Sequence, residues 1–145
     1  MKLKLLIAFL CILDVLFCFG SFVEGSEWVY YFTSPGSGDF YYDKSSIDYH
    51  SKDTMKITEK HILNKHAIAK GEEYLGKKYR KVDHRIILTE VNCNLRSYRT
   101  LKHSGYSREG EMVHDINIGE HTGWYSIPKE TALDALYKQI CTSDN

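Results

Sequence analysis

The residues best suited to metal chemistry in this sequence are its histidines, because neutral imidazole is a common ligand of zinc and other transition metals. Five of them are candidates for such a site: His61, His66, His103, His114 and His121. No pair has the His-x-His, His-Glu-x-x-His or Cys-x-x-Cys spacing that places two ligands on one side of a helix or strand. We therefore expect scattered surface histidines and neither a metal ion nor another cofactor.

Residues for nucleophilic catalysis are also present without a local pattern. Serine, histidine and aspartate are abundant, but the sequence has no Gly-x-Ser-x-Gly elbow. The run Gly36-Ser37-Gly38 leads into a predicted strand and not into a helix N-terminus, so it lacks the context of a phosphate-binding loop. A binding role is favoured over an enzymatic one.

The densest charge run is Lys77-Lys78-Tyr79-Arg80-Lys81. One interpretation is a solvated loop. The functional interpretation is that Lys77, Lys78, Arg80 and Lys81 contact an acidic glycan or an acidic protein surface, because clustered cations raise the local potential even where net charge is zero. The whole chain has 19 Lys+Arg against 19 Asp+Glu, which argues against a globally basic nucleic-acid-binding domain.

Residues 1–25 have the pattern of a secretory signal peptide, with an apolar run over residues 5–13 after a lysine-containing start. The predicted cleavage lies between Gly25 and Ser26, so a single domain of residues 26–145 remains. The alternative is an uncleaved membrane anchor, which Asp14 disfavours because a carboxylate inside a spanning helix costs roughly 2.5–3.5 kcal/mol on insertion scales. We expect an exported protein that is periplasmic, surface-attached or secreted.

Four cysteines divide between the two parts of the chain. Cys11 and Cys18 follow large apolar residues where lipid attachment needs a small one, so no lipid anchor is expected. Cys93 and Cys141 remain in the predicted domain, and an even number of cysteines in an oxidising compartment indicates one disulfide. Closing a loop of that length contributes about 4 kcal/mol in the chain-entropy model.

The elements that must position these residues are mostly strands, identified by aromatic and β-branched residues or by alternating polarity. Their expected ranges are 27–33, 40–43, 54–63, 84–91, 95–101 and 111–118. A turn cluster at 34–39 joins the first two strands as a hairpin, and short connections favour an antiparallel meander. Residues 64–82 are the least regular section, with a short helix over 67–75 or a long excursion as alternatives.

A helix is expected to begin at Pro128, because proline is accepted in the first turn and Glu130 suits the positive helix end. One apolar stripe runs along it: Leu133, Leu136, Tyr137 and Ile140. Cys141 continues this stripe and therefore points toward the sheet. The predicted fold class is α+β, with an antiparallel sheet of about six strands and one C-terminal helix pinned to it by Cys93–Cys141.

Tyrosine is enriched, with eleven residues in the chain. Tyrosine provides large contact area at binding surfaces, but four positions are better explained as core residues in a domain poor in phenylalanine: Tyr30, Tyr41, Tyr98 and Tyr137.

A series of short motifs runs along nearly the whole predicted domain. In order they are Trp28-Val29-Tyr30, Gly38-Asp39-Phe40-Tyr41-Tyr42-Asp43-Lys44-Ser45-Ser46-Ile47, Asn92-Cys93, Arg96-Ser97-Tyr98-Arg99, Tyr106 with Gly110, Trp124-Tyr125-Ser126-Ile127-Pro128 and Ile140-Cys141. Together they resemble the bacterial surface-adhesin protein E family.

The resemblance implies an exported six-stranded domain with one helix held by the Cys93–Cys141 bridge, and it is compatible with homodimerisation through the sheet. For function it implies a non-enzymatic adhesin of the cell envelope whose partner is an extracellular or envelope protein, or an acidic glycan. The alternative is a periplasmic structural or assembly factor that pairs its sheet edge with another envelope protein.

Overall fold

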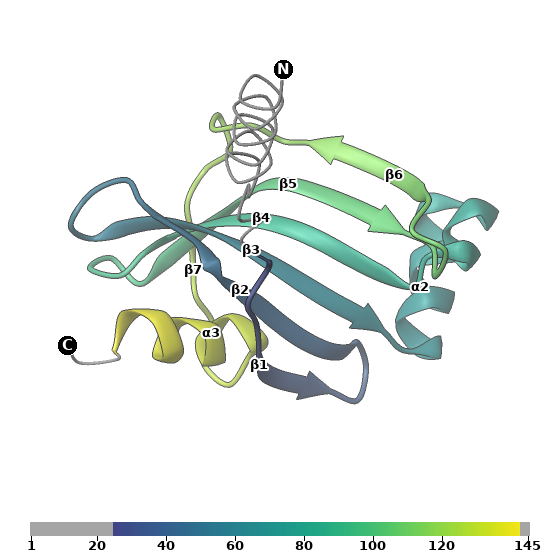
Figure 1. Cartoon of the computed structure of the whole chain (residues 1–145), viewed down its shortest axis with the longest axis horizontal. Helices are drawn as coiled ribbons and strands as arrows, with labels where there is room; N and C mark the ends of the chain where they lie inside the picture. The colour runs from purple at the N-terminus through teal and green to yellow at the C-terminus, as the bar shows by residue number, and fades with distance from the viewer. Residues whose placement is uncertain (1–24, 143–145) are drawn as a thin grey trace, which may run out of the picture.

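The computed structural model describes residues 25–142, which form one curled antiparallel sheet with helices at two places (Figure 1). Residues 1–24 of the predicted signal peptide (residues 1–25) lie outside the described residues. The strands are β1 (Trp28–Ser34), β2 (Gly38–Tyr49), β3 (Thr54–Leu63), β4 (His84–Asn92), β5 (Ser97–Tyr106), β6 (Met112–Asn117) and the short β7 (Tyr125–Ser126). The helices are α2 (Lys65–Leu75), the 3-10 turn η1 (Lys77–Lys81) and α3 (Ala132–Cys141).

The strands follow one another across the sheet in the order β1-β2-β3-β4-β5-β6, and every neighbouring pair is antiparallel. This arrangement confirms the predicted α+β meander. The two residues of β7 pair with the start of β5, outside that order. Among the described residues, β1 and β6 are therefore the two edge strands of the main sheet.

Two strands, β2 and β5, differ from the predicted bounds by more than one residue. β2 extends well beyond residues 40–43 to Tyr49, with a register irregularity between Asp43 and Asp48 that lets the polar stretch continue pairing with β3. β5 begins at Ser97 and not at 95, because the residues between β4 and β5 form a turn in which Arg96 has a φ of 47°.

The section over residues 64–82 is helical. Asn64 caps α2 by accepting a hydrogen bond from the Ala67 backbone N–H, at 2.9 Å. Gly76, with a φ of 82°, then separates α2 from η1. Of the two interpretations, the helix is correct, and it lies at the end of the sheet far from α3 (Figure 1).

The C-terminal helix α3 is confirmed, but its predicted start at Pro128 is wrong. Thr131 is the N-cap, and its hydroxyl accepts a hydrogen bond from the Asp134 backbone N–H. Glu130 has a φ of 61°, so the chain cannot continue a helix from Pro128 through it. Asp134 takes the place at the positive helix end that was expected for Glu130.

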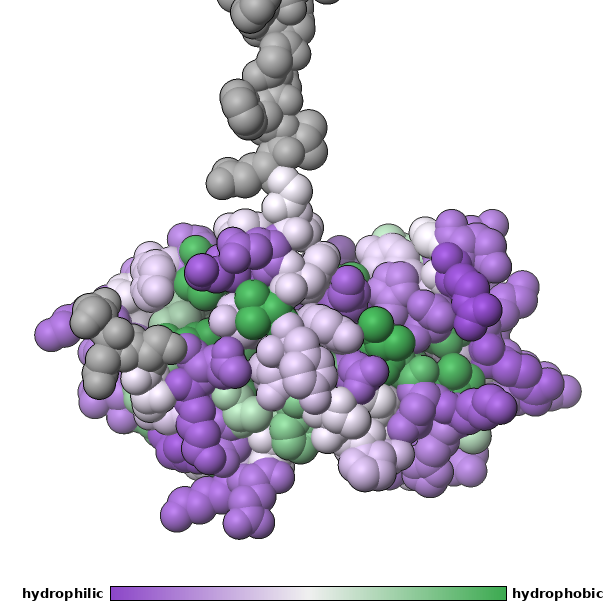
Figure 2. All heavy atoms as spheres, turned by 60° about the horizontal axis from the view of Figure 1, so that its bottom comes forward, coloured by the Kyte–Doolittle hydropathy of each residue, from purple (hydrophilic) through white to green (hydrophobic). Residues whose placement is uncertain are grey.

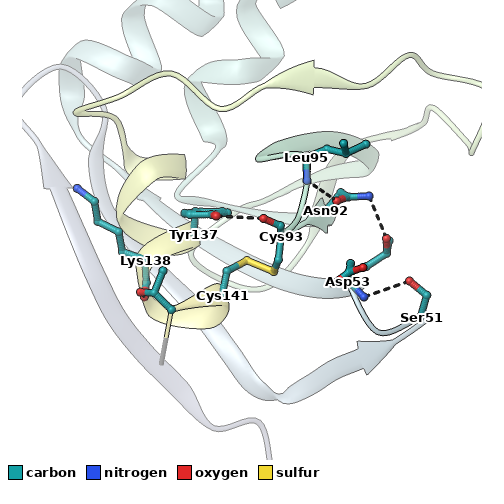
Figure 3. Close-up of a disulfide and its surroundings, with 10 residues drawn as sticks. Ser51, Asp53, Asn92, Cys93, Leu95, Tyr137, Lys138 and Cys141 are labelled. Atoms are coloured by element: carbon teal, nitrogen blue, oxygen red, sulfur yellow. Dashed lines mark hydrogen bonds between the residues drawn. A yellow bond between two sulfur atoms is a disulfide. The ribbon is translucent and has the colours of Figure 1, made fainter. Parts of the chain in front are cut away.

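The predicted Cys93–Cys141 disulfide joins the last turn of α3 to the end of β4, with 5.5 Å between the two Cα atoms (Figure 3). Tyr137, one turn earlier in α3, donates a hydrogen bond from its hydroxyl to the Cys93 carbonyl, at 3.0 Å. The helix end is therefore fixed to the sheet both covalently and through a hydrogen bond.

The main core lies between α3 and the sheet. Its buried residues are Tyr31, Phe40, Tyr42, Ile57 and Leu136. The expectation that Tyr30 fills the core is wrong: Tyr30 is half exposed, while its neighbour Tyr31 points inward, because successive side chains of a strand alternate between faces.

A second, smaller cluster of buried residues lies at the α2 end of the sheet: Leu63, Tyr79 and Val82. Of these, Tyr79 belongs to η1, whereas α2 itself has no buried residue. Across residues 25–142, no helix combines the length and apolar character needed to cross a bilayer.

Candidate binding site

A row of polar and charged side chains crosses the face of the sheet that the helices cover. His61 of β3 pairs across the strands with Arg85 of β4, which pairs with Gly105 of β5, which pairs with His114 of β6. Directly opposed residues share a face, so the side chains of His61, Arg85 and His114 lie on the same face. Between Arg85 and His114 stands only Gly105, which has no side chain. We call Glu59, His61, Arg85, His103 and His114 the polar row.

The Glu59 end of the row is fully hydrogen-bonded although it is buried. Tyr31 donates its hydroxyl hydrogen to Glu59 Oε2 at 2.6 Å, and the Thr89 hydroxyl donates to Oε1. His61 Nε2 lies 3.5 Å from Oε2. Burial opposes ionisation of Glu59, but the hydrogen bonds from His61, Thr89 and Tyr31 and the charge of His61 outweigh it and lower its pKa.

The same contacts act oppositely on Tyr31. Burial and the nearby Glu59 carboxylate raise the pKa of the Tyr31 hydroxyl, so it remains a hydrogen-bond donor. Glu59 is thus a carboxylate held in place by fixed donors on three sides.

The other end of the row has donors and acceptors without partners. Arg85 Nη2 lies 3.4 Å from His61 Nδ1, but Arg85 Nε has no hydrogen-bond partner among the described residues. The same holds for His103 Nε2 and for both ring nitrogens of His114, all of them shielded from solvent. An unpaired buried polar group costs about 1–3 kcal/mol, so this arrangement is unfavourable for stability.

These imidazoles are held neutral by their surroundings. Burial, followed by the charges of Arg85, His114 and His61, lowers the pKa of His103 to about 4. Burial and Arg85 also lower the pKa of His114, against a smaller opposing effect of Asp115. At neutral pH His103 and His114 are therefore uncharged, and the guanidinium of Arg85 beside them is positively charged.

Two glycines allow the packing around His114. A Cβ atom at Gly105 would lie 2.2 Å from the His114 ring, and one at Gly71 of α2 would lie 2.0 Å from the Tyr79 ring. Tyr79 stacks on His114 with their ring centroids 5.5 Å apart. The imidazole is thus enclosed between the β5 backbone and the Tyr79 ring.

A hollow of about 570 Å³ lies between α2 and this part of the sheet. We call it the α2 hollow, and its lining residues are Gly36, Ser37, His66, Ala67, Lys70, Gly71, Tyr74, Leu75, Tyr79, Arg85, His103 and Ile116. Its volume falls within the range of small-ligand pockets, about 300–1,000 Å³. No acidic residue lines it.

The predicted basic contacts lie beside this region, on η1 and not on a loop. Lys77, Lys78, Arg80 and Lys81 are all exposed. Arg80 is already engaged, because its Nη2 and Nε donate to the Glu72 carboxylate at 2.6 and 3.0 Å. Three free ammonium groups therefore remain from the four predicted cations within the described part of the chain.

A second hollow, of about 760 Å³, lies on the other side of η1 and is lined partly by Arg80 and Lys81. It also contains Asp83, Glu109 and Glu111, so the charges of both signs are mixed there. The α2 hollow differs because it is lined by basic side chains and by no aspartate or glutamate.

Sequence reasoning missed the polar row. Its histidines were expected to be scattered at the surface, but His61, His103 and His114 lie together, within one face of the sheet. Within residues 25–142, no group of three or more His, Cys, Asp or Glu side chains has a geometry that could hold a metal ion. The only sequence signal was the alternation of each strand, which gives the face of a residue but not its neighbours on other strands.

The curled antiparallel meander has the disulfide-anchored helix α3 at one end and α2 at the other (Figure 1). The family model described as surface-adhesin protein E matches residues 28–142, and the chain belongs to that family. No curated protein matches it in sequence.

Two solved structures of Haemophilus influenzae protein E share its fold. Crystal form II is 14% identical with a TM-score of 0.56, covering 81% of this chain and 89% of that one. The selenomethionine form is 14% identical with a TM-score of 0.52, covering 78% and 86%. The family is thus that of a surface adhesin, and it favours binding over catalysis.

Proposed function

We propose that this protein is an exported adhesin of the bacterial cell envelope that binds an acidic glycan, or an acidic surface of an extracellular or envelope protein. The observation that carries the proposal is the family match over residues 28–142 together with the cationic groups around η1 and α2. The unpaired ammonium groups of Lys77, Lys78 and Lys81 supply the long-range attraction.

Hydrophilic side chains are prominent at both ends of the molecule, around α3 and α2, with apolar patches between them (Figure 2). Exposed lysines steer an acidic partner toward a surface more than they add to final affinity, and salt screens this effect. Arg80 contributes less, because the Glu72 carboxylate already offsets its charge.

The test is binding of the purified protein to immobilised heparin and to matrix-protein surfaces at increasing salt. The variant Lys77→Gln, Lys78→Gln, Lys81→Gln should bind more weakly and with a flatter salt dependence. The matched control changes three other exposed lysines to glutamine: Lys44, Lys52 and Lys129. Equal loss in both triple variants would contradict the η1 assignment, and no binding to any acidic surface would contradict the proposed function.

A second candidate function is pairing through a sheet edge with another envelope protein or a second copy of this chain. It is favoured by the β6 edge, where Met112 and Ile116 are exposed, as is the following Ile118. Sedimentation across a concentration series tests self-association. The variant Ile116→Lys should abolish a β6-mediated dimer, and a monomer at all concentrations would exclude self-pairing.

A further inference from the structure

The α2 hollow has a one-sided charge. Lys70 and His66 of α2 line it, as do Arg85 of β4 and His103 of β5, whereas no aspartate or glutamate does. Arg80, by contrast, is paired with Glu72, and the second hollow contains Asp83, Glu109 and Glu111. A hollow with several basic groups and no acid favours an anionic ligand over a metal cation.

The hollow is also adjacent to nitrogens that lack partners. Arg85 Nε and His103 Nε2 belong to residues that line it, and both atoms are without a hydrogen-bond partner among residues 25–142. A buried donor that stays unpaired destabilises the fold, so a ligand that pairs it gains more than an ordinary surface contact would give. A guanidinium is matched to a planar carboxylate, which accepts two hydrogen bonds in the plane of the fork.

Aromatic rings complete the lining. Tyr79 is buried, and Tyr74 is 76% exposed at the side of α2. A tyrosine ring presents an apolar face with a polar tip, which suits the mixed apolar and hydroxylated surface of a sugar. The hollow therefore offers a charged partner at the sheet and ring surfaces beside the helix.

We propose that the α2 hollow binds the carboxylate of an acidic sugar, with Arg85 as its charged partner, His103 as a second hydrogen-bonding group and Tyr74 against the sugar ring. This inference rests on the proposed function and names the ligand class for it. The proposal assigns different roles to two surfaces. The lysines of η1 attract an acidic glycan, and the α2 hollow binds one of its sugar residues specifically.

The first test is NMR titration of the purified protein with glucuronic acid, following the imidazole signals of His103 and His114. Glucuronic acid should shift these signals saturably, and glucose at the same concentrations should not. Arg85→Gln should lower the affinity at least tenfold, since a hydrogen bond between charged groups is lost. Lys52→Gln, which changes an exposed lysine remote from the hollow, should leave the affinity unchanged.

Arg85 contacts His61, so its replacement could disturb the fold, and two exposed positions provide independent variants. Tyr74→Ala and Lys70→Gln change exposed residues that line the hollow, and each should weaken binding about threefold without changing thermal unfolding. Unchanged affinity in both would overturn the assignment.

The pKa of His103 gives a readout that a purely structural role would not move. The charges that lower it belong to Arg85 of β4, His114 of β6 and His61 of β3. His66, Lys70 and Tyr74 of α2 and Tyr79 of η1 line the same hollow. None of these groups is an acid that is ionised at neutral pH, and a bound carboxylate would oppose the effect of Arg85. Glucuronic acid should raise the pKa of His103 above its free value and bind more tightly at pH 5 than at pH 7.

Three outcomes would overturn the inference: equal shifts with glucose, equal competition by inorganic sulfate at matched ionic strength, or no response of the His103 and His114 signals. If the signals do not respond but heparin binding still depends on Lys77, Lys78 and Lys81, the hollow assignment fails and the proposed function stands. If heparin binding is also absent, both fail.

Discussion

The two ends of the helix-covered face differ in how well their polar groups are satisfied. At the α3 end, Leu136 is fully buried, Cys141 is bonded to Cys93, and the buried Asp134 has Arg96 and Lys138 as ionic partners. At the α2 end, the helix buries no residue, and the nitrogens beneath it are unpaired. The α3 end therefore supplies stability, while the α2 end retains unpaired groups that a ligand can use.

Asp134 shows how a buried charged group at the α3 end is paired. The Glu130 backbone N–H, Lys138 and Arg96 all favour its ionised form, and together they lower its pKa against the opposing effect of burial. Its carboxylate joins the start of α3 to the turn before β5. No comparable carboxylate faces Arg85 across the α2 hollow.

Removing the disulfide should have the largest effect on stability. The double variant Cys93→Ser, Cys141→Ser should lose about 4 kcal/mol of unfolding free energy, because the unfolded chain regains the freedom of a loop with 48 residues of separation. Urea denaturation measures the loss. A loss below about 1 kcal/mol would show that α3 docks equally well without the bond.

Truncating Leu136 should rank second. Leu136→Ala should cost about 3 kcal/mol, since it leaves a cavity between α3 and the sheet at a fully buried position. Leu75→Ala in α2 is the matched control, where the side chain is 50% exposed, and it should change stability by less than about 0.5 kcal/mol. Similar losses in the two helices would remove the contrast between the ends.

Acidification should lower the free energy of unfolding through His103, which lies at the α2 end. The pKa of His103 is lowered from 6.5 to about 4 in the folded protein, so between these pH values the unfolded chain binds more protons. Stability therefore falls as pH decreases through this window, by about 1–2 kcal/mol after allowing for the partial exposure of the ring. Urea denaturation at pH 7 and pH 4 measures this fall.

The histidine origin of this fall can be tested by replacement. The double variant His103→Phe, His114→Phe should flatten the pH dependence, whereas replacing the exposed His50 by glutamine should leave it unchanged. An unaltered slope in the double variant would assign the acid sensitivity to other groups, such as Glu59.

The smallest predicted effect has the opposite sign. His114→Phe should raise stability by about 1 kcal/mol at pH 7, because phenylalanine removes two unpaired nitrogens and keeps the stacking on Tyr79. Thermal unfolding of the variant measures the gain. A loss of stability would mean that the His114 nitrogens have hydrogen-bond partners in solution. The α2 end would then not differ from the α3 end in unpaired polar groups at this position.

Local pattern was sufficient for much of the fold. Alternation over residues 54–63 placed β3 at its observed bounds, with Met55 and Ile57 facing inward. The start of α3 could not be read correctly from Pro128, because the left-handed φ of Glu130 depends on how the preceding loop returns to the sheet. In the same way, the prediction that Tyr30 fills the core failed because the face of the sheet that α3 covers is decided by tertiary packing.

The candidate site was less predictable than the fold. The exposed cations of η1 were visible as a charge run, because they are adjacent in sequence. The partner that Arg80 finds in Glu72 depends on how η1 folds back beside α2. His103 and Arg85 show no local signal at all, since they become neighbours only when β4 and β5 pair.

By itself, the sequence determined the order of strands, the C-terminal amphipathic helix and the pairing of Cys93 with Cys141, because these depend on periodicity and on residue types along one segment. Only the tertiary structure decided that Arg85, His103 and His114 share one face beneath α2. The physical reason is that cross-strand register brings together residues from separate strands, and the energy of each unpaired group depends on neighbours that local periodicity does not specify.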